Sequence, residues 1–301
     1  MTAADVDGVT IEHEVHGPPN GEPILLVMGL GAQLILWPPA FIDRLTDAGY
    51  RVIAFDNRDV GRSSRIQAPV PTIADLATSL LAPRRARPPY TLRHMADDAA
   101  GLLDHLAIAR AHVVGVSMGG MIAQELTIAH SSRVASLTSI MSNTGARRGG
   151  KLHPALLPAL LKSRSAEAGS VEVAIEVGRL IAGPHFDEQA ARDIHALSTS
   201  RGGDLAAARA GLARQTLAVT ATRDRTADLR RVTAPTLVVH GLLDRLVRPS
   251  GGVATARAVP GARLVMYPDM AHDVPDVRID EITVDIVENC RRAPVALPVS
   301  A

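Results

Sequence analysis

Cysteine and aromatic residues are scarce in this sequence. Its 301 residues include one cysteine, one tryptophan, three tyrosines and three phenylalanines. The single cysteine, Cys290, cannot form an intramolecular disulfide or a thiolate metal site, and we expect it to have no chemical role. A chain without disulfides suits a reducing compartment, so we expect a cytoplasmic protein.

An excess of charge of either sign is also absent. The 32 Lys and Arg residues balance 31 Asp and Glu residues, which leaves a formal net charge of +1. Such a chain has no overall field that would attract nucleic acid or an anionic membrane, and we expect no nucleic-acid partner. The local exception is the arginine cluster between prolines at residues 82–89, which we interpret as a solvated loop.

Long apolar runs are missing as well. Charges or prolines interrupt every apolar segment before it reaches the length of a membrane span. Residues 1–14 carry acidic side chains where a secretory signal needs a basic patch and then an apolar run. We therefore expect a globular protein without stable membrane insertion, either a monomer or a homodimer.

What the sequence does contain is an alternation of short apolar strands and amphipathic helices. Strands are predicted within residues 22–31, 50–64, 111–117, 134–142, 234–244 and 262–272. Helices are predicted within residues 36–50, 91–108, 119–133 and 279–292. This alternation predicts an α/β fold with a mostly parallel central sheet flanked by helices, and ligand sites beyond the carboxyl ends of the strands.

One long segment breaks the alternation. Between residues 143 and 231, apolar helical stretches such as 154–163 and 171–183 follow one another without a convincing strand. We predict a helical cap formed by residues 146–230, inserted into a core formed by residues 1–145 and 231–301.

The sequence GVSMG at residues 115–119 lies where a predicted strand meets a predicted helix. Gly115 and Gly119 allow a turn sharp enough to project the Ser117 hydroxyl above the sheet, as in a nucleophile elbow. A serine hydroxyl is a weak nucleophile at neutral pH, so it needs an imidazole base and a carboxylate that orients the base.

Both partners are present in the order that this architecture uses. Asp244 and His272 each follow a predicted strand, so both belong to the carboxyl edge of the sheet. We predict that Ser117 is the nucleophile, His272 the base and Asp244 the acid. Asp273 is a weaker alternative for the acid, because neighbours in a loop usually point apart.

A tetrahedral intermediate of acyl transfer also needs N–H donors for its negative oxygen. We predict that these are the amides of Met118 and of Leu30, which lies in a glycine-rich loop after the first long strand. Gly29 and Trp37 are candidates for the substrate pocket, although a tryptophan beside two prolines is more often part of the core packing. No zinc-type spacing of ligands occurs, and we predict no metal and no cofactor.

These features together resemble the α/β-hydrolase superfamily over essentially the whole chain. Residues 25–38, 55–64 and 111–120 resemble a group of bacterial, largely actinobacterial, esterases and lipases that includes anthracycline methylesterases of the aclacinomycin type. The resemblance implies a cap over the active site and a serine hydrolase. It also implies the same triad of Ser117, Asp244 and His272, with an acyl-enzyme formed from small to medium hydrophobic esters.

Two positions depart from the common pattern of the superfamily. Met28 precedes Gly29 where many relatives have histidine, and Asp59 follows Arg58 where glycine is common. The first change alters the side chain that lines the loop and leaves the backbone donor in place. We interpret Asp56 and Arg58 as a structural ion pair or a brace of their loop.

Several alternatives stay open. Lactonases, thioesterases, perhydrolases and C–C hydrolases can share the serine triad, and some members of the superfamily only bind ligands. A dinucleotide-binding oxidoreductase would use Gly29, Gly31 and Asp56, but its third glycine position holds Leu34. His112 and His240 are interpreted as packing histidines.

Overall fold

The computed structural model describes residues 2–147, 149–162 and 170–293. The predicted cap therefore includes positions, 148 and 163–169, that lie outside the described residues. Eight strands form one sheet in the order β1-β2-β4-β3-β5-β6-β7-β8. The strands are β1 (Thr2–Val6), β2 (Val9–His16), β3 (Pro23–Val27), β4 (Arg51–Phe55), β5 (Ala111–Val116), β6 (Val134–Ile140), β7 (Thr236–Gly241) and β8 (Arg263–Tyr267).

Strands β3 to β8 are parallel, as the alternation predicts, whereas β1 and β2 form an antiparallel edge. This hairpin was not among the predicted strands. Its turn is Asp7-Gly8, and both residues have positive φ angles, 49° and 80°. Asp-Gly is a preferred pair for such a two-residue turn, so the signal was present in the sequence.

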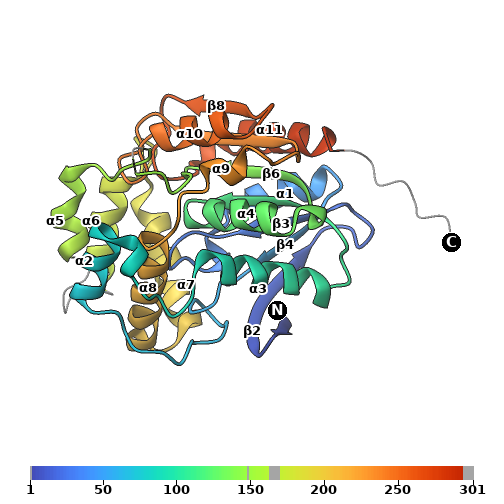
Figure 1. The fold of residues 1–301 in the computed structure, drawn as a ribbon. Helices are drawn as coiled ribbons and strands as arrows, with labels where there is room; N and C mark the ends of the chain where they lie inside the picture. Colours follow the sequence, from blue (N-terminus) through green and yellow to red (C-terminus); the bar gives the residue numbers. More distant parts are fainter. Residues whose placement is uncertain (1, 148, 163–169, 294–301) are drawn as a thin grey trace.

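Helices cover both faces of the sheet, and the side chains of β3 show how the faces divide. Ile24 and Leu26 pack with α1 and α11, while Leu25 and Val27 pack with α3 and α4. Figure 1 shows α3 and α4 together beside the central strands. The helices of the sheet region are α1 (Pro39–Asp47), α3 (Leu92–His105), α4 (Met118–Ala129), α10 (Ser250–Ala258) and α11 (Ile279–Arg291).

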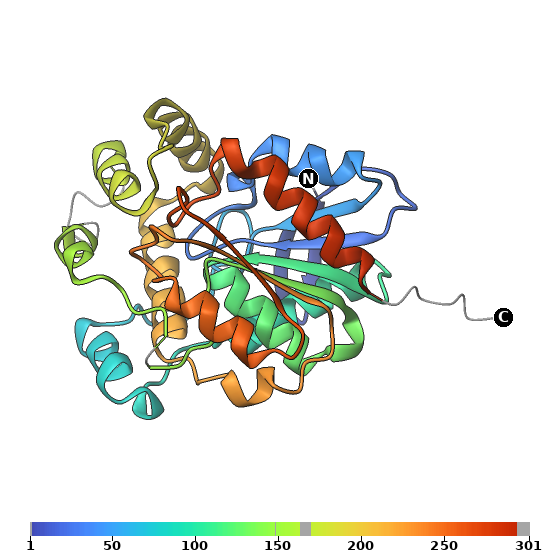
Figure 2. The same ribbon diagram turned by 90° about the horizontal axis from the view of Figure 1, so that it is seen from above.

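The described part of residues 146–230, which we call the cap, is helical. Its helices are α5 (Leu157–Lys162), α6 (Val171–Ile181), α7 (Glu188–Gly202), α8 (Leu205–Thr220) and α9 (Thr226–Leu229). Helices α5 to α8 gather at one end of the molecule, together with α2 (Ile73–Leu81) (Figures 1 and 2). Short 3₁₀ turns are η1 (Leu34–Leu36), η2 (Pro83–Arg85), η3 (Ser131–Arg133), η4 (Pro154–Leu156) and η5 (Asp276–Arg278).

The loop after β4 carries two carboxylates that hold the cap on the sheet. Asp56 pairs with Arg201 of α7 at 2.5 Å, and Asp59 pairs with Arg214 of α8 at 2.7 Å, and all four side chains are buried. Arg58 pairs with a different acid, Asp98 of α3. Asp56 and Arg58 therefore do not pair with each other, and the alternative of a loop brace agrees with the structure, because each residue joins the loop to a different helix.

Candidate active site

Ser117 occupies a sharp turn between β5 and α4. Its backbone angles, φ 55° and ψ −118°, are rare for a residue with a side chain. A Cβ atom on Gly115 would lie 2.2 Å from the carbonyl oxygen of Gly119, and one on Gly119 would lie 2.0 Å from that of Val27. Only glycine fits at either position, and these two glycines therefore allow the sharp turn at Ser117.

The turn brings Ser117 to the imidazole of His272. The Nε2 atom of His272 lies 2.9 Å from Ser117 Oγ, and its Nδ1 atom lies 2.8 Å from Asp244 Oδ2. Because the carboxylate only accepts, the neutral ring carries its proton on Nδ1, and Nε2 is left to accept the serine hydroxyl proton. The fold thus brings together three side chains that the sequence separates by up to 155 positions.

The Asp244 side chain is fully enclosed. Its Oδ1 atom accepts hydrogen bonds from the amides of Leu246 at 2.9 Å and Val247 at 2.8 Å. Burial alone would raise the pKa of Asp244, but the hydrogen bonds from His240, His272 and the Val247 amide outweigh it and lower that pKa below its usual range. Asp244 is therefore an ionised acceptor fixed in one orientation.

His240 is buried, as expected of a packing residue, but it also lies beside the acid. Its Nε2 atom is 2.7 Å from the carbonyl oxygen of Val247 and 3.4 Å from Asp244 Oδ2. A carbonyl oxygen only accepts, so Nε2 carries the proton. This contact was missed in the sequence, where the only sign of it is the separation of four residues between His240 and Asp244.

The other candidates from the sequence lie apart from this chain of hydrogen bonds. Asp273 accepts from the amides of Ala271 and Gly183, so it braces its loop against the cap. His112 is buried beside Ser136, in agreement with a packing role.

The loop after β3 lies over the nucleophile. A Cβ atom on Gly29 would be 3.4 Å from Ser117 Cβ, and the next residue, Leu30, is partly exposed. Met118 is the first residue of α4, and amides in the first turn of a helix have no acceptor one turn earlier. Trp37 is 2% exposed and packs on Phe41, so the structure favours the packing alternative for it.

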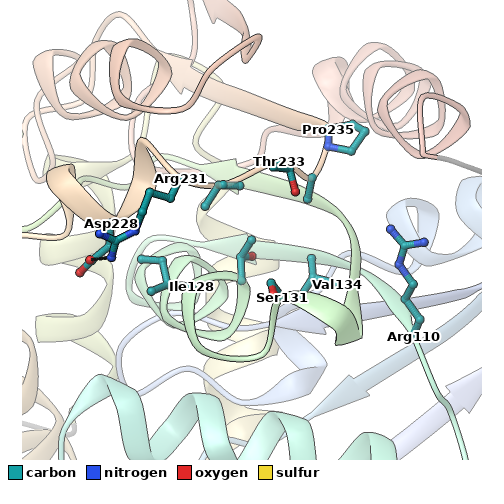
Figure 3. A pocket seen from close by; sticks show the side chains of 11 residues that line it. Arg110, Ile128, Ser131, Val134, Asp228, Arg231, Thr233 and Pro235 are labelled. Carbon is teal, nitrogen blue, oxygen red and sulfur yellow. Dashed lines mark hydrogen bonds and ion pairs between the residues drawn. The ribbon is translucent and has the colours of Figure 1, made fainter.

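Among the cavities of the described residues, one lies far from the predicted triad and another lies beside Asp244. The one in Figure 3, about 480 Å³, is lined among others by Arg110 and Pro235, which precede β5 and β7, and by Val134, the first residue of β6. It lies at the amino ends of these strands, opposite the triad. A second cavity of about 760 Å³ adjoins Asp244 between the loop after β7 and the end of α6, and Leu180 lines it.

Within the described residues, no group of three or more His, Cys, Asp or Glu side chains is placed to hold a metal ion. No helix in the same residues is long and apolar enough to cross a membrane.

A mostly parallel sheet that presents a serine on a strand-to-helix elbow, with a histidine and an acid at the same edge, defines the α/β-hydrolase class. The comparison with protein families agrees. The family model described as the alpha/beta hydrolase fold matches residues 22–278, and the chain belongs to this family. The α/β fold expected from the sequence is confirmed, and so is the resemblance to the α/β-hydrolase superfamily.

Individual relatives cover nearly the whole chain. It is 29% identical to rhodomycin D methylesterase DnrP of Streptomyces peucetius, over 96% of this chain and 97% of that protein. Among solved structures, an enol-lactonase from Burkholderia xenovorans has a TM-score of 0.74 at 24% identity and covers 97% of this chain and 100% of its own. A thermophilic esterase from Thermogutta terrifontis has a TM-score of 0.71 at 25% identity, with 97% of both chains covered.

Proposed function

We propose that the protein is a serine carboxylic-ester hydrolase that works through an acyl-enzyme. The observation that carries the proposal is the continuous chain of hydrogen bonds from Ser117 through His272 to Asp244. The class of enzyme agrees with the family and with relatives that are named methylesterases. The hydrogen-bonded geometry supports the proposed roles of these three residues within that class.

In the proposed reaction, Ser117 Oγ attacks the ester carbonyl carbon while His272 Nε2 takes the hydroxyl proton. The amides of Met118 and Leu30 donate to the oxygen that becomes negative. Collapse of the tetrahedral intermediate breaks the ester C–O bond, and His272 gives its proton to the leaving alcohol. Water then attacks the acyl carbon while His272 Nε2 takes one of its protons. The second tetrahedral intermediate breaks the bond between the acyl carbon and Ser117 Oγ, His272 returns the proton to Oγ, and the acyl group leaves as a carboxylic acid.

The proposed substrates are small to medium hydrophobic esters. The cavity beside Asp244 is lined in part by Leu180, Leu242 and Leu243, whose side chains are 38%, 50% and 46% exposed. Apolar surface of this kind stabilises a hydrocarbon group that leaves water. Two relatives are named rhodomycin D methylesterases, and we infer from these names that the substrate of this chain is an ester of a small alcohol, of which a methyl ester is the simplest.

Hydrolysis of nitrophenyl esters from acetate to laurate tests this function. We expect Ser117→Ala and His272→Ala to lose turnover by about 10⁴-fold or more, because nucleophile and base act as a unit. Asp244→Asn should lose about 10⁴-fold through the wrong imidazole tautomer. The matched control is Asp273→Asn, which removes the neighbouring acid and should keep activity within about tenfold.

Turnover that persists in Ser117→Ala would contradict the proposal. A folded native protein that hydrolyses none of the esters and takes up no fluorophosphonate label at Ser117 would favour the alternative of a ligand-binding member of the family.

A further inference from the structure

Helix α8 of the cap contacts the loop that carries one of the proposed oxyanion donors. The amide of Gly31 donates to Gln215 Oε1 at 2.8 Å, and Gln215 Nε2 donates to the carbonyl oxygen of Arg58 at 2.8 Å. Gln215 is 0% exposed, so no water competes for either bond. One side chain of the cap thus joins the loop after β3 to the loop after β4.

The Gly31 amide belongs to the turn that holds Leu30. Ala32 N donates to the carbonyl oxygen of Gly29, and Gly31 has a φ of 67°, which describes a β-turn with glycine in its third position. Leu30 is the second residue of this turn. Gln215 therefore holds the central peptide group of the turn, the group that directly follows the proposed donor.

The side chains of α8 also leave this turn little room to move. A Cβ atom on Gly31 would lie 2.9 Å from Leu212 Cδ1, one turn before Gln215 on the same helix. A turn packed this closely and bonded at its centre keeps one conformation. Donors that are fixed before the reaction stabilise a developing negative charge more than donors that must reorient.

We propose that Gln215 is a positioning residue that fixes the direction of the Leu30 amide in the oxyanion hole, so that docking of the cap completes the catalytic geometry. This role rests on the proposed function, because it needs a reaction that develops an oxyanion at Ser117. Gln215 itself touches neither Ser117 nor His272 in the hydrogen bonds of the structure.

The test compares Gln215→Met with a control on the same helix. Methionine keeps the length of the side chain and loses both hydrogen bonds. Thr220→Val removes a different bond of α8, the contact of 2.7 Å with the Ser79 hydroxyl of α2, and leaves the turn untouched. For each variant we would measure kcat and KM, the inhibition constant of a trifluoromethyl ketone that forms a tetrahedral adduct, and thermal stability.

We expect Gln215→Met to lower kcat about tenfold or more, less than the roughly 10²–10³-fold loss that follows removal of a donor, with KM within about threefold. The inhibition constant of the ketone should rise by a similar factor. Thr220→Val should lose comparable stability with unchanged kcat. Gln215→Glu keeps the acceptor for Gly31 but cannot donate to Arg58, and it should not restore native kcat.

Equal effects of Gln215→Met and Thr220→Val on kcat, or native kcat in Gln215→Met, would overturn the positioning role of Gln215. Either result would leave the proposed ester hydrolysis untouched. Fluorophosphonate labelling separates this result from failure of the proposed function. The native protein is labelled first, before any Gln215 variant is compared. If Ser117 of the native protein takes up no label, both proposals are overturned.

Discussion

A single residue, Ser117, shows how the site departs from ordinary backbone preferences. Its φ of 55° with ψ of −118° places a residue with a side chain in a region that glycine prefers. Such a conformation costs about 1–3 kcal/mol and persists only where the surroundings enforce it. Here the close packing of Gly115 on Gly119, and of Gly119 on Val27, enforces it.

Ser117→Gly should therefore be more stable than Ser117→Ala, although both variants lack the nucleophile. Alanine keeps the strained Cβ, whereas glycine relieves about 1–3 kcal/mol and loses about 0.5–1 kcal/mol through the greater freedom of the unfolded chain. The expected net gain is about 1 kcal/mol. Urea unfolding of the two inactive variants measures it, and equal stabilities would show that the turn is not strained.

At the scale of helices and strands, sequence patterns predicted the parts of the fold that repeat. Apolar runs located β3 to β8, and because loops at the carboxyl ends of parallel strands share one edge, Asp244 and His272 could be assigned before their distance was known. The elbow was predictable from its two glycines. The edge hairpin was missed although Asp7-Gly8 is a turn signal, because charged and polar residues interrupt β1 and β2, so that neither strand forms a continuous apolar run.

Contacts between the cap and the sheet could not be predicted in the same way. Gln215, Arg201 and Arg214 lie on helices without a motif, and their partners are 145 to 184 residues away along the chain. Helical spacing shows which residues share a face but not which loop that face meets. His240 was unpredictable for a related reason, since its contact with Asp244 depends on the path of the loop after β7.

The ion pair between α8 and the loop after β4 makes stability depend on pH. Burial alone would raise the pKa of Asp59, but hydrogen bonds from Arg214, Tyr90 and the Ile66 amide outweigh it, and the folded pKa is lower than the ordinary 3.8. A group with a lowered folded pKa contributes stability that is complete above its ordinary value and is lost as the pH falls through the folded one. Acid should therefore weaken the docking of α8.

We expect Asp59→Asn to lower the free energy of unfolding by about 3–5 kcal/mol at pH 7, because it leaves Arg214 buried without a counter-charge. Asparagine tolerates the positive φ of 70° at this position, so the backbone should not add to the loss. The difference in free energy from the native protein should shrink as the pH falls below 3.8 and through the lower folded pKa of Asp59. Protonation then removes the negative charge of Asp59 in the native protein, as asparagine does at every pH.

Urea unfolding at a series of pH values measures both quantities. The matched control is Asp280→Asn, which breaks the exposed pair with Arg44 and should change stability by less than about 1 kcal/mol. A gap between Asp59→Asn and native protein that stays constant down to acid pH would contradict the role of the ionised carboxylate.

In the whole molecule, several contacts join the described part of the cap to the sheet region, and three of them involve different elements of the cap. The two chain ends of the cap meet at Arg225, which is fully buried and donates to Gln124 of α4 and to the carbonyl oxygen of Asn143. Burial lowers the pKa of Arg225 to about 10. Helices α7 and α8 supply the second junction through their buried ion pairs. At the third, the amide of His272 donates to the carbonyl oxygen of Ile181 at the end of α6.

Because these junctions involve different elements of the cap and two of them are formed by buried side chains, we expect the cap and the sheet to unfold in one cooperative transition. Trp37 packs on Phe41 in the core and is the only tryptophan, so its fluorescence reports on the sheet region. The proposed role of Gln215 makes ester hydrolysis depend on the docked cap. On heating, the loss of activity, of Trp37 fluorescence and of helical circular dichroism should coincide.

Arg201→Met removes one junction and leaves Asp56 buried without its partner. The activity of this variant should therefore be lost several degrees before its fluorescence changes. Native curves that separate in the same way would show that the cap opens independently and that the junctions do not couple it to the sheet.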